Sequence, residues 1–173
     1  MADATFNTTS GQTIKRELLL AALNTGTAST PVWSVFGKRV SDSEISYDWQ
    51  EDVSDDILGN TYIEMKNPQI TQSFDPYALD AGDVALVKIW NLAVKDHDYV
   101  ALASQDVLIV HCYAGTADTA MVAERYSACA IRPTSLGGEG GGHLDMPIVV
   151  TYGGSRTLGT AAINAGVISF SAS

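Results

Sequence analysis

Histidine and cysteine are the residue types that most often bind zinc or form nucleophile–base pairs, and the chain has three histidines and two cysteines. No two of His97, His111 and His143 have metal-ligand spacing, and neither Cys112 nor Cys129 forms a CxxC or CxxH cluster. His111 lies in an apolar segment, which favours a hydrogen-bonded histidine that is buried or faces a lumen over a metal ligand. Both cysteines lie in apolar stretches, so we expect buried free thiols rather than a disulfide.

Carboxylates concentrate in residues 41–64, where calcium binding or acid–base catalysis would be the corresponding chemistry. An EF-hand loop needs glycine at its sixth position, but counting from Asp48 the sixth residue is Val53. Asp55 and Asp56 are neighbours in sequence, and neighbours in an extended chain point to opposite faces, so they do not make a catalytic pair. Weak binding of cations at the surface stays an alternative.

The glycine-rich segment 137–143 resembles a phosphate-binding loop only in its glycine content. It lacks the Lys-Ser/Thr pair of a P-loop, and no helical pattern follows it. We interpret it as a mobile hairpin loop that could order when a neighbouring molecule arrives. With no nucleophile–base set in view, we expect no enzyme activity, no cofactor and no metal site.

The elements that position these residues are mostly short strands. Residues 144–152 show the period-two alternation of a half-buried strand, and Pro147 suggests an edge strand or a bulge. Residues 69–74 are expected to be another short strand, which follows the turn signal Asn67-Pro68. The single convincing helix is residues 79–95, whose apolar residues recur at helical spacing. Further strands are expected at 14–23 (alternatively a short helix), 32–40, 44–53, 60–66, 106–114, 119–132 and 167–170.

The predicted fold is therefore mainly β, a sandwich or partly closed barrel with one flanking amphipathic helix. We expect residues 1–13 to be a flexible leader. Residues 14–173 would form one domain, with a long loop at about 41–64.

The loop at 41–64 combines eight acids with regularly spaced apolar residues and has no Lys or Arg. An arm that docks on another molecule explains both properties, because its apolar side chains would bury there while its carboxylates keep the free subunit soluble. The alternative is that the apolar residues complete the subunit's own core. The candidate contact residues are Ile45, Tyr47, Trp49, Val53 and Ile57.

Composition narrows the classes of function. The chain has 173 residues, 46% of them hydrophobic, and a formal net charge of -10. Such an acidic protein lacks the basic face that a sequence-reading nucleic-acid binder needs. No apolar run approaches the ~18 residues that span a bilayer. Residues 15–23 imitate a signal peptide, but Glu17 interrupts them, so we expect a soluble protein that is not exported by a signal.

Several segments, taken in order, resemble one protein family across most of residues 14–170. They are Lys15-Arg16-Glu17-Leu18-Leu19-Leu20-Ala21, Pro31-Val32-Trp33, Gly37-Lys38-Arg39-Val40, Ser46-Tyr47-Asp48, Asp56-Ile57-Leu58-Gly59 and Asp75-Pro76. In these segments the chain resembles the major tail tube proteins of long-tailed, non-contractile bacteriophages (siphophages).

This resemblance implies a β-sandwich that assembles into hexameric rings, which stack into a tube around the tape measure protein. The hairpin that reaches the adjacent ring would be residues 41–64. The implied partners are further copies of the chain, the tape measure protein and a tail terminator, with transient passage of duplex DNA and no membrane insertion. The implied location is the virion tail, after synthesis in the bacterial host cytoplasm. Acids that would face the channel or an interface are Asp48, Glu51, Asp52, Asp55 and Asp56.

Two other classes of function stay open at this point. One is a monomeric β-sandwich binding module, an adhesin or carbohydrate-binding domain, with Trp33 and Trp49 as an aromatic platform. The other is a virion protein that forms a single ring, such as a tail terminator or head-completion protein. A small hydrolase ranks last because it lacks a visible catalytic set.

Overall fold

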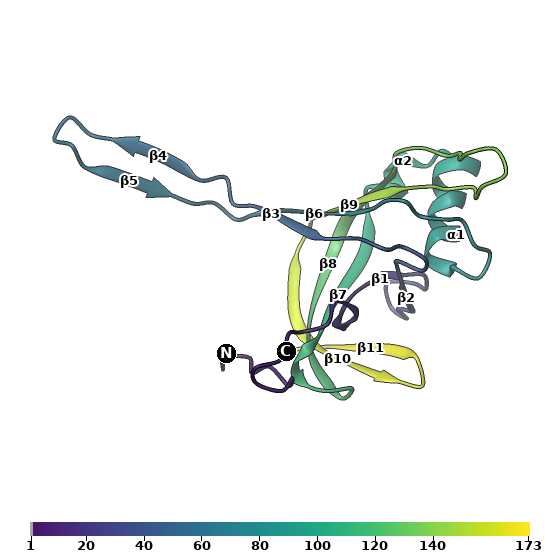
Figure 1. Cartoon of the computed structure of the whole chain (residues 1–173), viewed down its shortest axis with the longest axis horizontal. Coiled ribbons are helices and arrows are strands. Elements are labelled where there is room, and N and C mark those ends of the chain that lie inside the picture. Colours follow the sequence, from purple (N-terminus) through teal and green to yellow (C-terminus); the bar gives the residue numbers. More distant parts are fainter. Residues whose placement is uncertain (1) are drawn as a thin grey trace.

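The computed structural model describes residues 2–173 and consists mainly of antiparallel strands, with a long hairpin projecting from the body (Figure 1). The mainly β fold class predicted from the sequence is confirmed. The strands are β1 (Leu19–Asn24), β2 (Trp33–Val35), β3 (Ile45–Asp48), β4 (Asp52–Asp55), β5 (Thr61–Glu64), β6 (Gln69–Phe74), β7 (Gln105–Thr116), β8 (Ala120–Pro133), β9 (Ile148–Tyr152), β10 (Arg156–Asn164) and β11 (Val167–Ala172). The helical segments are η1 (Arg16–Leu18), α1 (Val84–Trp90), η2 (Asn91–Lys95) and α2 (Tyr99–Leu102).

Nine strands form one sheet that splits into two leaves along the long strand β8. The first leaf has the order β2-β1-β7-β8-β10-β11, and the second has the order β8-β9-β6-β3. The first leaf curls until β11 approaches β2, but these two strands do not pair, so the barrel is not closed. The remaining strands, β4 and β5, pair only with each other.

The split occurs where the chain passes from β9 to β10 at Gly153-Gly154. The amide nitrogen of Ala128 donates to the carbonyl oxygen of Gly153 at 3.3 Å, so the turn stays against β8. Gly154 has a φ of 74°, and a Cβ atom there would lie 2.7 Å from the Ala128 nitrogen. Only glycine fits this position, and the tight turn lets β9 and β10 pair with successive parts of one strand.

Alternating residues of β7 fill two separate cores. Val107 and Ile109 face the larger core between the two leaves, where α1 also packs. Leu108 and Val110 face the smaller core inside the curled first leaf. Burial on both faces explains why residues 107–110 form an uninterrupted apolar run.

The predicted helix at 79–95 begins later than expected. Leu79 donates its amide to the carbonyl of Leu144 at 2.9 Å, so it belongs to a bridge between segments rather than to a helix. Asp83 is the N-cap, and its side chain accepts a hydrogen bond from the amide of Leu86 at 3.1 Å. The second half of the segment is a π-helix, η2, and the short helix α2 was not predicted.

Three strand predictions were too long. Residues 14–23 begin with η1, and only the part from Leu19 is a strand. Residues 32–40 are extended only at β2, because Gly37 and Arg39 have φ values of 100° and 65° and turn the chain. Residues 144–147 bond to the segment before α1, with the amide of Met146 donating to the carbonyl of Tyr77 at 2.8 Å.

Two further expectations differ from the structure. Pro147 precedes β9, which lies between β8 and β6 inside the sheet, so the prediction of an edge strand there was wrong. The leader 1–13 is in part bound to the body: Asn7 donates its amide to the carbonyl of Tyr113 at 2.9 Å, and Phe6 packs edge-on against the same tyrosine. Within residues 2–173, no helix is long and apolar enough to cross a membrane.

Candidate assembly interface

The most exposed feature of the molecule is a two-stranded ribbon, residues 49–66, which we call the arm. It continues the β3–β6 pair outward: the amide of Lys66 donates to the carbonyl of Trp49 at 3.1 Å, and β4 then pairs with β5. Figure 1 shows that the arm extends far from both leaves. Of the predicted loop at 41–64, residues 45–48 lie in the second leaf and only the remainder from Trp49 projects.

The carboxylate of Asp56 organises the tip of the arm. One oxygen accepts from the amides of Leu58 at 2.8 Å and Asn60 at 2.9 Å. The other accepts from the Asn60 side chain at 2.8 Å and the Tyr62 hydroxyl at 2.9 Å. Hydrogen bonds from Asn60 are the main reason that the pKa of Asp56 falls to about 2. The tip therefore has a defined shape although nothing covers it.

The predicted contact residues divide between the body and the arm. Ile45 is half-buried and packs on the larger core, so for this residue the alternative holds that it completes the subunit's own core. Tyr47 and Trp49 stack with ring centroids 6.1 Å apart and are about half exposed. Val53 is 53% exposed and Ile57 is 102% exposed, so neither completes the subunit's own core. Sequence reasoning missed four other exposed apolar residues of the arm: Leu58, Tyr62, Ile63 and Met65.

The candidate acids fall into two groups. Asp48, Asp55 and Asp56 accept local hydrogen bonds that shape the ribbon. In contrast, Glu51 and Asp52 have no hydrogen-bond or ion-pair partner within the described chain. Asp52 lies directly opposite Glu64 across the ribbon, and that acid also has no such partner among residues 2–173. Like charges directly opposite each other destabilise a strand pair, so this end of the arm lacks a cation.

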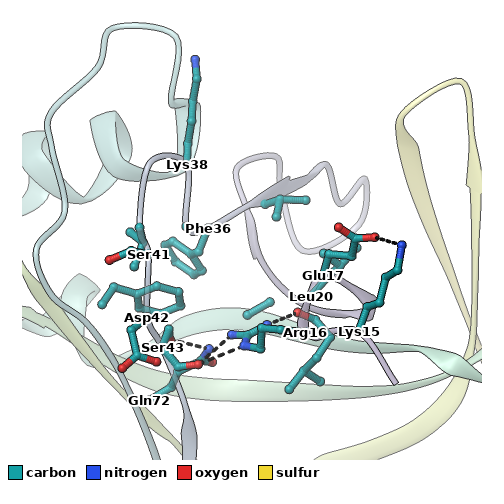
Figure 2. Close-up of a pocket in the computed structure, with 16 residues that line it drawn as sticks. Lys15, Arg16, Glu17, Leu20, Phe36, Lys38, Ser41, Asp42, Ser43 and Gln72 are labelled. Carbon is teal, nitrogen blue, oxygen red and sulfur yellow. Dashed lines mark hydrogen bonds and ion pairs between the residues drawn. The ribbon is translucent and has the colours of Figure 1, made fainter. Parts of the chain in front are cut away.

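A groove of about 1010 Å³ lies between the edges of the two leaves, and we call it the inter-leaf groove (Figure 2). Its floor is largely apolar, and three of the chain's ten Lys and Arg residues line it. The lining residues are Lys15, Arg16, Glu17, Leu19, Leu20, Ala21, Val35, Phe36, Gly37, Lys38, Val40, Ser41, Asp42, Ser43, Gln72 and Phe74.

The three cations of this groove are held differently. Arg16 donates to the backbone oxygens of Ser43 and Leu19 at 2.8 Å each, and no carboxylate of the described chain lies within ion-pair distance of it. Lys15 is 3.7 Å from the exposed carboxylate of Glu17. Lys38 is 2.9 Å from an oxygen of Asp80. In Figure 2, Arg16 reaches across to Ser43, and the Lys38 side chain extends away at the other end.

A buried polar cluster centred on Glu124 lies below the base of the arm. Its carboxylate accepts from His111 Nε2 at 2.8 Å, Arg156 Nε at 2.6 Å and the Tyr126 hydroxyl at 2.9 Å. Burial alone would raise the pKa of Glu124, but hydrogen bonds from His111, Arg156 and Tyr126 outweigh it and lower the pKa to about 2. His111 is thus hydrogen-bonded rather than free. The carboxylate is a fixed structural anion with three partners, and sequence reasoning did not find this cluster.

Other chemistry-bearing residues stay apart. In residues 2–173, no group of three or more His, Cys, Asp or Glu side chains is arranged to hold a metal ion. Cys112 and Cys129 are free thiols, the first half-buried and the second buried. Trp33 is only 7% exposed and lies beneath the guanidinium of Arg125. It therefore cannot form an exposed aromatic platform with Trp49, and this part of the prediction was wrong.

Comparisons with known proteins give structural likenesses only. No family model matches the sequence, and no curated protein matches it. A chain of the sheath–tube complex of an extracellular contractile injection system, PVC, in the extended state is 11% identical; the match covers 87% of this chain and 94% of that chain with a TM-score of 0.44. The PVC sheath/tube terminator in the extended state is 14% identical, over 87% of this chain and 99% of that chain, with a TM-score of 0.47.

A third similar structure is the tube terminating cap of the anti-feeding prophage. It is 14% identical, over 90% of this chain and 96% of that chain, with a TM-score of 0.45. The similar chains thus come from tube, terminator and cap assemblies, and PVC is a contractile system whereas the sequence resemblance is to non-contractile tails. At these identities and TM-scores, the likenesses carry no inference about function.

Proposed function

We propose that this chain is a structural subunit of a tail tube that assembles with copies of itself and catalyses no reaction. The observation that carries the proposal is the arm. An isolated two-stranded ribbon is at best marginally stable in water, and this one exposes seven large apolar residues. Another molecule must cover that surface for the ribbon to be stable. Monomeric proteins rarely keep an apolar patch of this kind exposed.

Free strand edges support assembly in a second way. β2, β3 and β11 each end a leaf, and each has one edge without a strand partner in the described structure. Such edges readily pair with another chain, and a closed ring would satisfy all of them. The resemblance to siphophage tail tube proteins suggests hexameric rings that stack into a tube in the virion tail, with a tape measure protein inside.

Charge supports a role as a DNA conduit. A ring of six chains of net charge -10 would carry about -60 charges, a large field of one sign. A negative channel repels duplex DNA, so DNA would slide during ejection rather than bind. Asp48, Glu51, Asp52, Asp55 and Asp56 are the proposed acids of the lumen or of an interface.

Electron microscopy of the purified, concentrated protein tests this function. The tube proposal expects rings that stack into filaments with a central channel wide enough for duplex DNA. Single rings that never extend would instead identify a terminator-like protein. Only monomers, across a range of salt concentration and pH, would refute assembly.

A binding module is the second candidate, and the Tyr47–Trp49 stack favours it. Two stacked, half-exposed aromatic rings form a surface on which a sugar ring could pack. Binding on a glycan array that is lost in Trp49→Ala, from a protein that stays monomeric, would support this candidate over the tube.

A further inference from the structure

The arm lacks two things that its own chain does not supply. Asp52 and Glu64 face each other without a cation, and the nearest basic residue in sequence, Lys66, forms no ion pair within the described structure. At the tip, Ile57 and Leu58 are 102% and 81% exposed and need apolar cover. A surface that fits the arm must therefore combine cations with an apolar floor.

The inter-leaf groove has this combination. Leu19, Leu20 and Phe36 contribute to its apolar lining, and Lys15 and Arg16 stand at one end. It also contains two carboxylates, Glu17 and Asp42, of which the first is already paired with Lys15. Arg16, held in place by backbone oxygens rather than by a carboxylate, offers its charge to an incoming acid.

Three other grooves fit less well. The groove that Arg16, Ile45 and Tyr47 line has Arg16 as its single Lys or Arg, and it also contains the carboxylates of Asp42 and Glu44. The groove beside α2 and the start of the 134–146 loop has Arg132 as its single Lys or Arg. The cavity under Trp49 has only Arg156, whose guanidinium is committed to Glu124 at 2.6 Å. Charge complementarity therefore favours the inter-leaf groove.

We propose that the arm of one copy docks in the inter-leaf groove of a second copy, an inference that rests on the proposed assembly. Asp52 and Glu64 would meet Lys15 and Arg16, and the tip would cover part of the apolar floor. The occupant is a second copy because the arm projects away from its own body (Figure 1). Arm and groove are different surfaces of one chain, so the contact is head-to-tail and repeats into a ring or an open stack.

Charge reversal at the groove tests the proposal. Lys15→Glu changes a side chain that is 77% exposed, so the subunit should fold normally, as circular dichroism would show. We expect the lowest protein concentration that gives sedimentable assemblies at low salt to rise about tenfold or more. Lys95→Glu is the matched control, since this lysine is 66% exposed and 3.8 Å from Asp96 but lies outside the groove; it should change that concentration less than about twofold.

The arm supplies the complementary change. Asp52→Lys should weaken assembly alone and restore it when combined with Lys15→Glu, because each interface regains an opposite-charge pair. Assembly of Lys15→Glu at the wild-type concentration would overturn the docking proposal and leave the tube proposal standing. Absence of any wild-type assembly would refute both.

Crosslinking locates the contact directly. The photo-crosslinker p-benzoylphenylalanine would replace Leu58 in the full-length protein, and mass spectrometry would map the products of irradiated assemblies. We expect intermolecular crosslinks to residues 15–21 or 35–43. Crosslinks to residues 93–102 or 132–136 instead would place the arm in the competing groove and overturn the proposal.

Discussion

A substitution of Ile57 at the tip of the arm should weaken assembly without changing the stability of the isolated subunit. Its side chain is fully exposed, so Ile57→Ser should change the free energy of unfolding of the isolated subunit by less than about 0.5 kcal/mol. Burying an isoleucine side chain in an interface contributes about 1.5–3 kcal/mol. If the arm docks on each added subunit, the critical concentration for assembly should rise about tenfold to 100-fold.

Two measurements check this reasoning. Urea unfolding of the dilute subunit should give the same midpoint for the wild type and Ile57→Ser, and sedimentation should show the shifted critical concentration. Ile57→Leu is the matched control, because it keeps the apolar area and should assemble like the wild type. An unchanged critical concentration for Ile57→Ser would show that the tip stays in solvent, and a lower urea midpoint would show that Ile57 has a contact within its own chain.

Three further predictions concern the arm and the cluster beneath it. Trp49 is about half exposed, so Trp49→Ala should lower the free energy of unfolding by about 1.5–2.5 kcal/mol, roughly half the cost for a fully buried aromatic residue. The same change should abolish assembly. A loss of about 3–5 kcal/mol in urea unfolding would instead show that Trp49 is a core residue. Because the pKa of Asp56 is lowered from 3.8 to about 2, its carboxylate holds the tip fully above pH 4 and loses this role as the pH falls toward 2. The protection factor of the Leu58 amide, its exchange rate relative to an unstructured peptide at the same pH, should therefore fall over this range, and an unchanged protection factor would contradict this. Glu124→Gln leaves Arg156 without its counter-charge and should lower the free energy of unfolding at pH 7 by about 2–3 kcal/mol, measured with urea. The difference between wild type and variant should shrink as the pH falls from 4.5 through about 2, because Glu124 of the wild type is then protonated.

Local sequence signals were enough to predict strands that are bounded by clear turn residues. The strand at 69–74 was predicted with the bounds that the structure shows, because it lies between the turn signals Asn67-Pro68 and Asp75-Pro76. The structure adds that Ile70, Gln72 and Phe74 are its buried residues. The outward and returning strands of the arm were also predicted, but the break between β3 and β4 was not. Gln50 there has a φ of 48°, a conformation that a propensity argument does not anticipate for glutamine.

Strand β10 was not predicted because its sequence carries no local strand signal. Its residues are mostly small, and Gly159 and Ala161 give no apolar alternation to detect. The strand exists because β8 and β11 flank it, and because the Phe170 ring and the backbone of Ser171 occupy the place where a larger side chain at Gly159 would lie. Its existence depends on partners from elsewhere in the chain, which no window of sequence contains.

The sequence by itself determined that the protein is mainly β, acidic, and equipped with an arm rich in both carboxylates and apolar residues. Periodicity, charge and composition can be read from the sequence because they do not depend on contacts between distant segments. Only the tertiary structure decided which of those residues the subunit covers: it buried Trp33 and half-buried Ile45, and it left Ile57 in solvent. It also brought His111, Glu124 and Arg156 together from three strands and created the inter-leaf groove. These arrangements depend on how distant segments pair and pack, and the pairing of β7, β8 and β10 is fixed by the whole fold.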